Sequence, residues 1–294
     1  MKSRSKSVRT YGMRERSDRL DFYIRTQDAR PPLEEMHRHD YFQIQINLGG
    51  DTVQQIGGAT RPFPTGTIAF ILPHRLHRIP HPPDGRFMVI NVSQDFLLPG
   101  LQCDPLDLED VPLSQAPELA PFRFQENLDF QVPAEELPAL EALLARMLQV
   151  DRERGFGSAA VLRGCLLQLI GQACMRQAEA LQAGLPRHGR RQALARVSAH
   201  IDARLDQADL SLNSAAAAAF LSPSHLAHLL RKTLDRSFTE WVLERRMTRA
   251  KSLLLTSDKR IGEVAHACGF ADEAYFSRRF RQAVGMSPRQ FRQQ

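Results

Sequence analysis

The stretch that decides the fold is residues 261–292, which read IGEVAHACGFADEAYFSRRFRQAVGMSPRQFR. Apolar residues recur at helical spacing on both sides of Gly269, which predicts a helix, a tight turn and a second helix. Gly269 supplies the positive φ that such a turn needs, and Asp272 can cap the second helix. Phe276 and Phe280 face inward, one helical turn apart. This pattern is typical of a helix-turn-helix module that reads the DNA major groove.

An earlier part of the chain repeats this pattern. A shift of 49 residues places Ala216 on Ala265, and a shift of 50 places Leu230 on Phe280. Residues 239–254 lie between the two copies and predict a long amphipathic helix that fixes the offset of two modules. Two readers ~34 Å apart would meet successive major-groove segments on one face of B-DNA. The basic residues expected on the exposed side of this helix are Arg245, Arg246, Arg249 and Lys251.

The run 261–292, together with SPSHL (222–226) and RRMTRAKSLL (245–254), resembles the DNA-binding region of the AraC/XylS family of bacterial regulators. The resemblance covers the last third of the chain and keeps the family's order of motifs. It implies two helix-turn-helix modules, an upstream effector-binding or dimerisation domain, and control of transcription, often by activation. Double-stranded DNA and RNA polymerase are the macromolecular partners that it implies.

Two positions of the first module depart from the family pattern. Phe220 stands where the turn usually has glycine, and Asp235 stands where glycine usually ends the reading helix. Aspartate tolerates the left-handed conformation, but phenylalanine at positive φ costs about 1 kcal/mol. This cost favours a shifted turn in the first module, with less secure DNA contacts than in the second.

Base readout, carried over from the family to matching positions, falls on the outward face of the second helix of each module. Arg278 is the best candidate for a bidentate contact with guanine, worth ~1–3 kcal/mol of discrimination. Each exposed arginine could also contact phosphates or only solvate the surface. The candidate DNA-binding residues are Ser224, His225, Ala227, His228, Arg231, Lys232, Glu273, Ala274, Ser277, Arg278, Arg279 and Arg281.

The charge distribution agrees with a polyanionic partner. The formal net charge is +6, but residues 186–294 hold 19 basic and 10 acidic side chains, whereas residues 21–185 hold 13 and 21. Such an asymmetry points to nucleic acid as the partner of the basic part. Residues 1–20 hold seven further basic residues and predict a basic flexible arm, which adds DNA contacts or is simply solvated.

The remaining compositional signals predict a cytoplasmic protein without cofactor or membrane contact. No stretch approaches the ~20 apolar residues of a membrane span, and the basic start lacks the apolar segment of a secretory signal. The four cysteines lie far apart, without metal-binding spacing, which predicts reduced and mostly packed thiols.

Residues 21–98 change to short β-rich runs separated by glycine and proline turns, such as QIQIN (43–47) and FMVINV (87–92). They predict a small β-barrel or sandwich. Residues 99–132 give no clear assignment. After Pro133 the spacing becomes helical and predicts two apolar helices, the second running to about Leu181. Their surplus apolar surface serves either core packing or a dimer seam.

The segments MHRHDYFQIQINLGG (36–50) and LPHRLHR (72–78) resemble the cupin-like sensor of the same family. Cupin enzymes hold a metal with His-x-His, a glutamate four residues later and a distant histidine. Here Gln43 takes the glutamate position, and glutamine is a weak ligand for Zn²⁺, Fe²⁺ or Ni²⁺. We therefore expect no metal, and histidines that shape an effector cavity by hydrogen bonding. The expected effector-binding residues are His37, His39, Gln43, Gln45, His77 and Arg78.

The sequence as a whole predicts an α+β chain with two domains. After the arm come a cupin-like β-barrel with following helices for effector sensing and dimerisation (21–182), a linker (183–190), and an all-α domain (191–294) with two helix-turn-helix modules joined by a long helix. The expected function is a homodimeric, sequence-specific transcription regulator, an activator rather than an enzyme, gated by a small-molecule effector.

Two other classes stay open on the sequence. One is a cupin-type metal-binding protein or enzyme with an appended DNA-binding module, suggested by the histidines. The other is a nonspecific DNA or RNA binder. The second class is disfavoured because the helices lack the interleaved aromatic residues of single-strand platforms.

Overall fold

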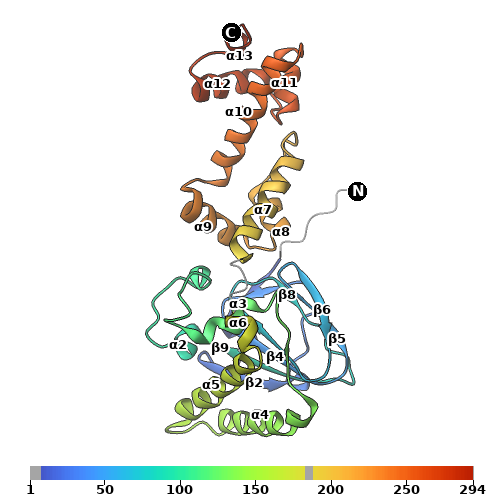
Figure 1. The fold of residues 1–294 in the computed structure, drawn as a ribbon, viewed down its shortest axis with the longest axis vertical. Helices are drawn as coiled ribbons and strands as arrows, with labels where there is room; N and C mark the ends of the chain where they lie inside the picture. Colours follow the sequence, from blue (N-terminus) through green and yellow to red (C-terminus); the bar gives the residue numbers. More distant parts are fainter. Residues whose placement is uncertain (1–7, 183–187, 294) are drawn as a thin grey trace. The chain divides into compact units, whose positions relative to one another are not determined.

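The computed structural model describes residues 8–182 and 188–293. The chain divides into two compact units, Met1–His188 and Gly189–Gln294. All described strands lie in the first unit and the second is helical, so the predicted α+β class with two domains is confirmed (Figure 1). Residues 183–187 of the predicted linker lie outside the described residues. Residues 188–190 form the beginning of the helix α7 (His188–Ala203), and the boundary between the two units lies within the predicted linker.

The strands of the first unit form a five-stranded sheet in the order β10-β7-β4-β9-β2, a three-stranded sheet in the order β6-β5-β8, and a parallel pair of β1 and β3. The bounds are β1 (Thr10–Tyr11), β2 (Phe22–Thr26), β3 (Arg38–His39), β4 (Phe42–Gly49), β5 (Thr52–Ile56), β6 (Ala59–Phe63), β7 (Thr67–Ile71), β8 (His77–Arg78), β9 (Arg86–Val92) and β10 (Phe130–Gln131).

The alternation of β4 sets the two faces of the five-stranded sheet, because successive side chains of a strand point to opposite sides. Phe42, Ile44 and Ile46 join the main hydrophobic core, whereas Gln43 and Gln45 are buried on the opposite face. A smaller apolar cluster holds side chains of β5, β6, β7 and β9, so the polar face is turned toward the three-stranded sheet. We call the space between these two sheets the sensor interior.

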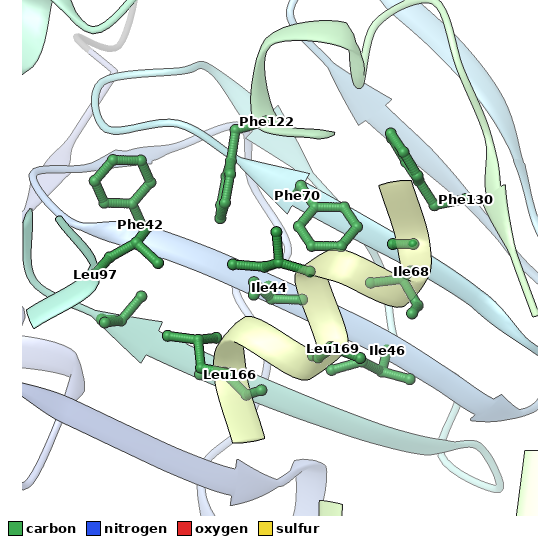
Figure 2. Packing of buried hydrophobic residues seen from close by; sticks show 14 of the residues in the cluster. Phe42, Ile44, Ile46, Ile68, Phe70, Leu97, Phe122, Phe130, Leu166 and Leu169 are labelled. Carbon is green, nitrogen blue, oxygen red and sulfur yellow. The ribbon is translucent and has the colours of Figure 1, made fainter. Parts of the chain in front are cut away.

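The main core lies between the five-stranded sheet and the helices α2 (Gln94–Leu97), α3 (Ala120–Phe124), α4 (Leu137–Arg152) and α5 (Ser158–Arg176). Helices α4 and α5 are the two predicted helices. The first unit also contains the short helices α1 (Met13–Arg16) and α6 (Ala178–Gln182). Figure 2 shows apolar side chains of the sheet facing those of α5. The residues are Phe42, Ile44, Ile46, Ile68 and Phe70 of the sheet, and Leu166 and Leu169 of α5.

Helix α5 corrects the prediction that no stretch approaches a membrane span. Its 19 residues are long and apolar enough to cross a membrane by length and composition. One side of the helix instead packs into the core, where Leu162, Leu166 and Leu169 are buried. Core helices commonly pass the same test, and Met175 on the other side is 78% exposed.

The N-terminal segment is not a flexible arm over the part that is described. Strand β1 pairs with β3, and Met13 of α1 is buried. The Ser17 hydroxyl accepts a hydrogen bond from Asn91 Nδ2 at 2.9 Å. Backbone and apolar groups between the basic residues therefore hold residues 8–20 against the barrel, and residues 1–7 lie outside the description.

The second unit consists of seven helices over its described residues: α7 (His188–Ala203), α8 (Leu212–Ala218), α9 (Pro223–Leu234), α10 (Phe238–Thr256), α11 (Ile261–Ala267), α12 (Glu273–Val284) and α13 (Pro288–Arg292). Two separate cores hold it together. Helix α10 contributes Phe238 and Val242 to the first, which includes α7, α8 and α9. It contributes Met247, Ala250 and Leu254 to the second, which includes α11 and α12. The predicted connecting helix is thus part of both modules.

Candidate nucleic-acid interface and sensor interior

In the second module, α12 presents its outward face around Arg278. The Asp272 side chain caps the helix by accepting from the Tyr275 N–H at 2.5 Å. Phe276 and Phe280 are fully buried on the opposite face. At 100° per residue Arg278 lies diametrically across from these two rings. It is exposed, so its guanidinium is at the centre of the face that the sequence assigned to DNA.

In the first module, α9 presents the equivalent face around His228. The Ser222 hydroxyl caps this helix by accepting from the His225 N–H at 2.9 Å. Leu226, Leu229 and Leu230 are buried, which turns His228 outward at the centre of the opposite face. The predicted positions of both reading helices relative to their cores are therefore confirmed.

The turns of the two modules differ in sequence but share one backbone conformation. Gly269 has φ +78°, and Phe220 in the equivalent place has φ +59°. The predicted shift of the first turn is wrong, because the phenylalanine accepts the left-handed conformation and its ring lies 5.2 Å from the Arg196 guanidinium carbon. Asp235 also takes the glycine conformation, with φ +50°. Gly269 has a second reason to be glycine, since a Cβ there would overlap the Leu205 carbonyl oxygen.

Comparing Phe220→Gly with Phe220→Ala isolates the backbone cost of this turn. Both variants lose the ring and its contact with Arg196, but only glycine adopts positive φ without strain. We expect Phe220→Gly to be more stable than Phe220→Ala by about 1 kcal/mol. Urea unfolding followed by the fluorescence of Trp241, which packs against the same core, measures the difference. Equal stabilities would mean that the turn does not hold a positive φ at this residue.

Two arginines of α10 that were expected to be exposed are instead anchored within the unit. The Arg245 guanidinium pairs with Asp202 at 2.5 Å and donates to the Ser198 hydroxyl at 2.9 Å. Arg246 donates to the backbone carbonyls of Leu205 and Gln207, at 3.2 and 2.7 Å. Their charges hold α10 against the end of α7, so they are not free for DNA. Arg249 and Lys251 are exposed as expected.

The remaining candidate contact residues fall into exposed and half-buried groups. Arg279 is half-buried, and it donates to Gln282 at 3.1 Å, so it is tied along the helix. The Glu273 carboxylate lies against Gly262 of α11. The exposed candidates are Ser224, Arg231, Lys232, Glu273, Ala274, Arg278 and Arg281, and the half-buried ones are His225, Ala227, His228, Ser277 and Arg279.

Sequence reasoning missed Tyr275, whose side chain is exposed on α12 beside the outward face. Its ring lies 6.1 Å from that of Phe270, which belongs to the core of the module. The helical period places Tyr275 100° from Phe276, and this spacing was the signal that could have found it.

In the sensor interior, a directed chain of hydrogen bonds joins several of the predicted effector residues. His81 Nε2 donates to Gln45 Oε1 at 2.9 Å, Gln45 Nε2 donates to Gln43 Oε1 at 2.7 Å, and Gln43 Nε2 donates to Asn91 Oδ1 at 2.9 Å. Asn91 then donates to Ser17. His81 and Asn91 were not among the predicted residues, because neither stands in the segments that carry the resemblance.

The three predicted histidines come together at one end of the sheets. The ring centroids of His37 and His39 lie 4.3 and 4.7 Å from that of His77. In each ring, Nδ1 is hydrogen-bonded to a backbone carbonyl oxygen. The Nδ1–O distance is 2.9 Å for His37, 2.6 Å for His39 and 3.0 Å for His77. Since a carbonyl only accepts, Nδ1 carries the proton and Nε2 carries the lone pair. Burial lowers the pKa of His39 to about 3 and that of His77 well below its usual value, so both rings are neutral.

The cupin metal set does not fit this arrangement. The Gln43 amide is occupied by Gln45 and Asn91. Within the described ranges, no three histidine, cysteine, aspartate or glutamate side chains are placed to hold a metal ion. The lone-pair nitrogens of His39 and His77 are buried and have no hydrogen-bond partner. Arg78 is half-buried beside His77 in β8, with its Nε likewise unpartnered.

A protein-family model described as an AraC-like ligand binding domain matches residues 21–230, which is more than half of the chain. The chain belongs to the AraC family. A second model, described as a helix-turn-helix domain, matches residues 215–294. This AraC-family chain therefore combines a domain of the AraC-like ligand-binding type with a helix-turn-helix domain.

Two individual relatives match less than half of this AraC-family chain. YijO of Escherichia coli K12, an uncharacterized HTH-type transcriptional regulator, is 43% identical over 95 residues, which is 32% of this chain and 33% of YijO. The arabinose operon regulatory protein of the same organism is 36% identical over 129 residues, 43% of each chain. These matches span less than half of the relatives' own length.

A longer and weaker match and a solved structure complete the comparison. The HTH-type transcriptional activator RhaS of Escherichia coli O1:K1 is 25% identical over 279 residues, which is 87% of each chain. The C-terminal domain of AraT, a response regulator from Geobacillus stearothermophilus, is 34% identical. It aligns with 34% of this AraC-family chain and 84% of its own, with a TM-score of 0.33.

Proposed function

We propose that this AraC-family chain is a sequence-specific DNA-binding transcription regulator, an activator gated by a small-molecule effector in the sensor interior. The observation that carries the DNA-binding part is the pair of capped helices α9 and α12, each buried on one face and polar on the other. Arg278 at the centre of the second face reads guanine by a bidentate contact. Arg231, Lys232 and Arg281 contact phosphates.

The proposal includes a homodimer that works with RNA polymerase in the bacterial cytoplasm and has no enzymatic activity. Support for the dimer is the apolar side of α5 that the core leaves uncovered, where Val161 and Met175 are exposed. Exposed apolar surface on a helix that is already packed on its other side is typical of a protein interface. The domain limits 21–182 and 191–294 remain our assignment for sensing and DNA binding.

Selection of bound sequences from a random duplex pool at ~150 mM salt tests this function, using the full chain. We expect wild type to enrich a bipartite motif whose two segments lie about one helical turn apart. Arg278→Ala should reduce the preference for guanine at one segment by a factor of ~5 to 150, because a bidentate guanine contact is worth about 1–3 kcal/mol. Arg249→Ala, an exposed arginine outside the reading helices, should keep the full motif.

Each outcome of the selection bears on a different part of the proposal. Enrichment of no sequence contradicts sequence-specific binding. Loss of preference in Arg249→Ala equal to that in Arg278→Ala contradicts the assigned readout. A homodimer predicts that the bipartite motif occurs in two copies, and selection of a single copy contradicts the dimer.

A further inference from the structure

Arg25 of β2 is a buried cation for which the protein provides no carboxylate. Its side chain is 5% exposed. Nη1 donates to the backbone carbonyls of Thr26 and Arg30, at 3.2 and 2.8 Å, and Nε is buried without a hydrogen-bond partner. No ion pair joins Arg25 to a described acidic residue. A guanidinium keeps its charge in proteins, so this site holds an uncompensated positive charge.

The sheet register places Arg25 inside the sensor. Arg25 pairs with Val89 of β9, and Val89 pairs on its other side with Gln45 of β4. Residues directly opposite each other in a sheet share a face, so Arg25 and Gln45 flank Val89 in the sensor interior. Gln45 accepts from His81, and the charge of Arg25 adds to burial in lowering the pKa of His81 to about 4.

Neighbouring cations increase the positive charge instead of neutralising it. Burial, followed by the nearby charge of Arg16, lowers the pKa of Arg25 to about 10, and Arg30 acts in the same direction. The Asp18 carboxylate is paired with Arg30 at 3.0 Å, and among the described residues no ion pair joins it to Arg25. The groups whose ionised form would favour the charge of Arg25 are the phenols of Tyr23 and Tyr41, and phenols are neutral at physiological pH.

A buried charge is stable only when an opposite charge or enough hydrogen bonds replace its lost hydration. We propose that the effector is a small carboxylate whose anionic group pairs with the Arg25 guanidinium in the sensor interior. A carboxylate accepts two parallel N–H bonds from a guanidinium, which matches the free Nε edge of Arg25. The inference rests on the proposed gating function and names the chemical class of its effector.

Thermal unfolding of the full chain in a panel of sodium salts tests the inference. The probes are formate, acetate, succinate and benzoate at constant ionic strength, with chloride as reference and the corresponding amides as neutral controls. We expect at least one carboxylate to raise the Tm of the first unit by about 5–10 °C at 100-fold excess over its Kd, whereas its amide does not. Arg25→Gln removes the charge but keeps an N–H donor for the Arg30 carbonyl. It should lose this response and be at least as stable as wild type in chloride.

Arg86→Gln is the matched control, because Arg86 lies on β9 of the same sheet but its side chain is 64% exposed and paired with Glu141. It should keep the full carboxylate response. The inference is overturned if no carboxylate raises the Tm, if amides act equally, if Arg25→Gln responds like wild type, or if Arg25→Gln fails to fold. Selection of DNA sequences by the same preparation tests the proposed function separately. If the protein selects a DNA motif but no carboxylate raises its Tm, only the inference about the effector is contradicted.

Discussion

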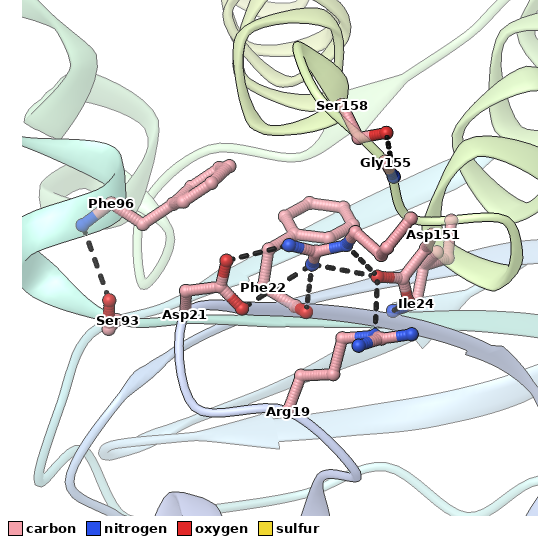
Figure 3. Close-up of polar contacts among 10 residues, drawn as sticks. Arg19, Asp21, Phe22, Ile24, Ser93, Phe96, Asp151, Gly155 and Ser158 are labelled. Carbon is pink, nitrogen blue, oxygen red and sulfur yellow. Dashed lines mark hydrogen bonds and ion pairs between the residues drawn. The ribbon is translucent and has the colours of Figure 1, made fainter.

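Asp151→Ala is expected to lower the free energy of unfolding of the first unit by about 3–5 kcal/mol. The carboxylate is 4% exposed at the end of α4 and accepts from Arg154 Nε at 2.9 Å and Nη2 at 2.8 Å. It also accepts from the Ile24 N–H at 3.2 Å, and Arg19 Nε lies 3.6 Å away (Figure 3). Because β2 is an edge strand, Asp151 supplies the acceptor that a neighbouring strand would otherwise provide. Alanine at position 151 would leave the buried Ile24 N–H and the two arginines without this carboxylate acceptor.

Scanning calorimetry of the full chain measures this loss, and the matched control is Glu141→Ala on the same helix. Glu141 pairs with Arg86 in an exposed ion pair, which is worth about 0–1 kcal/mol. The fluorescence of Trp241 reports on the second unit and should keep its unfolding transition in both variants. A loss of stability for Asp151→Ala no greater than that for Glu141→Ala would show that the buried network contributes nothing beyond a surface pair.

Lowering the pH from 7.5 to 5.0 is expected to cost the first unit about 4 kcal/mol of stability from two histidines alone. Burial lowers the pKa of His39 to about 3 and that of His81 to about 4, from a usual value near 6.5. Below pH 6.5 the unfolded chain takes up protons at these rings and the folded chain does not. Stability is therefore constant above about pH 7 and falls as the pH drops toward 4, by about 2 kcal/mol per ring at pH 5.

Urea unfolding of the first unit between pH 5 and pH 8 checks the direction and size of this slope. His81→Asn should remove roughly half of the loss, or about 2 kcal/mol at pH 5. His266→Gln, at an exposed histidine of the second unit, should leave the slope unchanged. A first unit whose stability rises on acidification would contradict neutral, buried imidazoles.

Local signals in the sequence were enough to predict the DNA-binding unit. The caps Ser222 and Asp272 and the apolar spacing of Phe276 and Phe280 act within one helical turn, so neighbouring residues determine them. Phe220 was misjudged because the cost of its positive φ, about 1 kcal/mol, is small compared with the packing of the whole module. Tertiary context fixed the turn, and no local pattern reports that context.

The sensor interior was predictable only in outline. The alternation in QIQIN placed Gln43 and Gln45 on one face, but their partners depend on sheet register, which brings together residues far apart in sequence. Arg25 escaped notice for the same reason, although the alternation of FYIRT (22–26) carries it to that face. The anchoring of Arg245 and Arg246 also depends on a distant segment, since exposed and anchored arginines have the same helical spacing.

Because α10 belongs to two cores, it sets the rotation of the outward face of α12 relative to that of α9. Val242 belongs to one core and Met247 to the other, with exposed Glu244 between them. Each residue of an α-helix advances the chain by about 1.5 Å and turns it by about 100°. One residue gained or lost between these anchors would swing the second reader around the helix axis by more than a quarter turn. If the proposed readout holds, the spacing of a bipartite operator depends on this residue count, and substitutions on α9 and α12 leave the count unchanged.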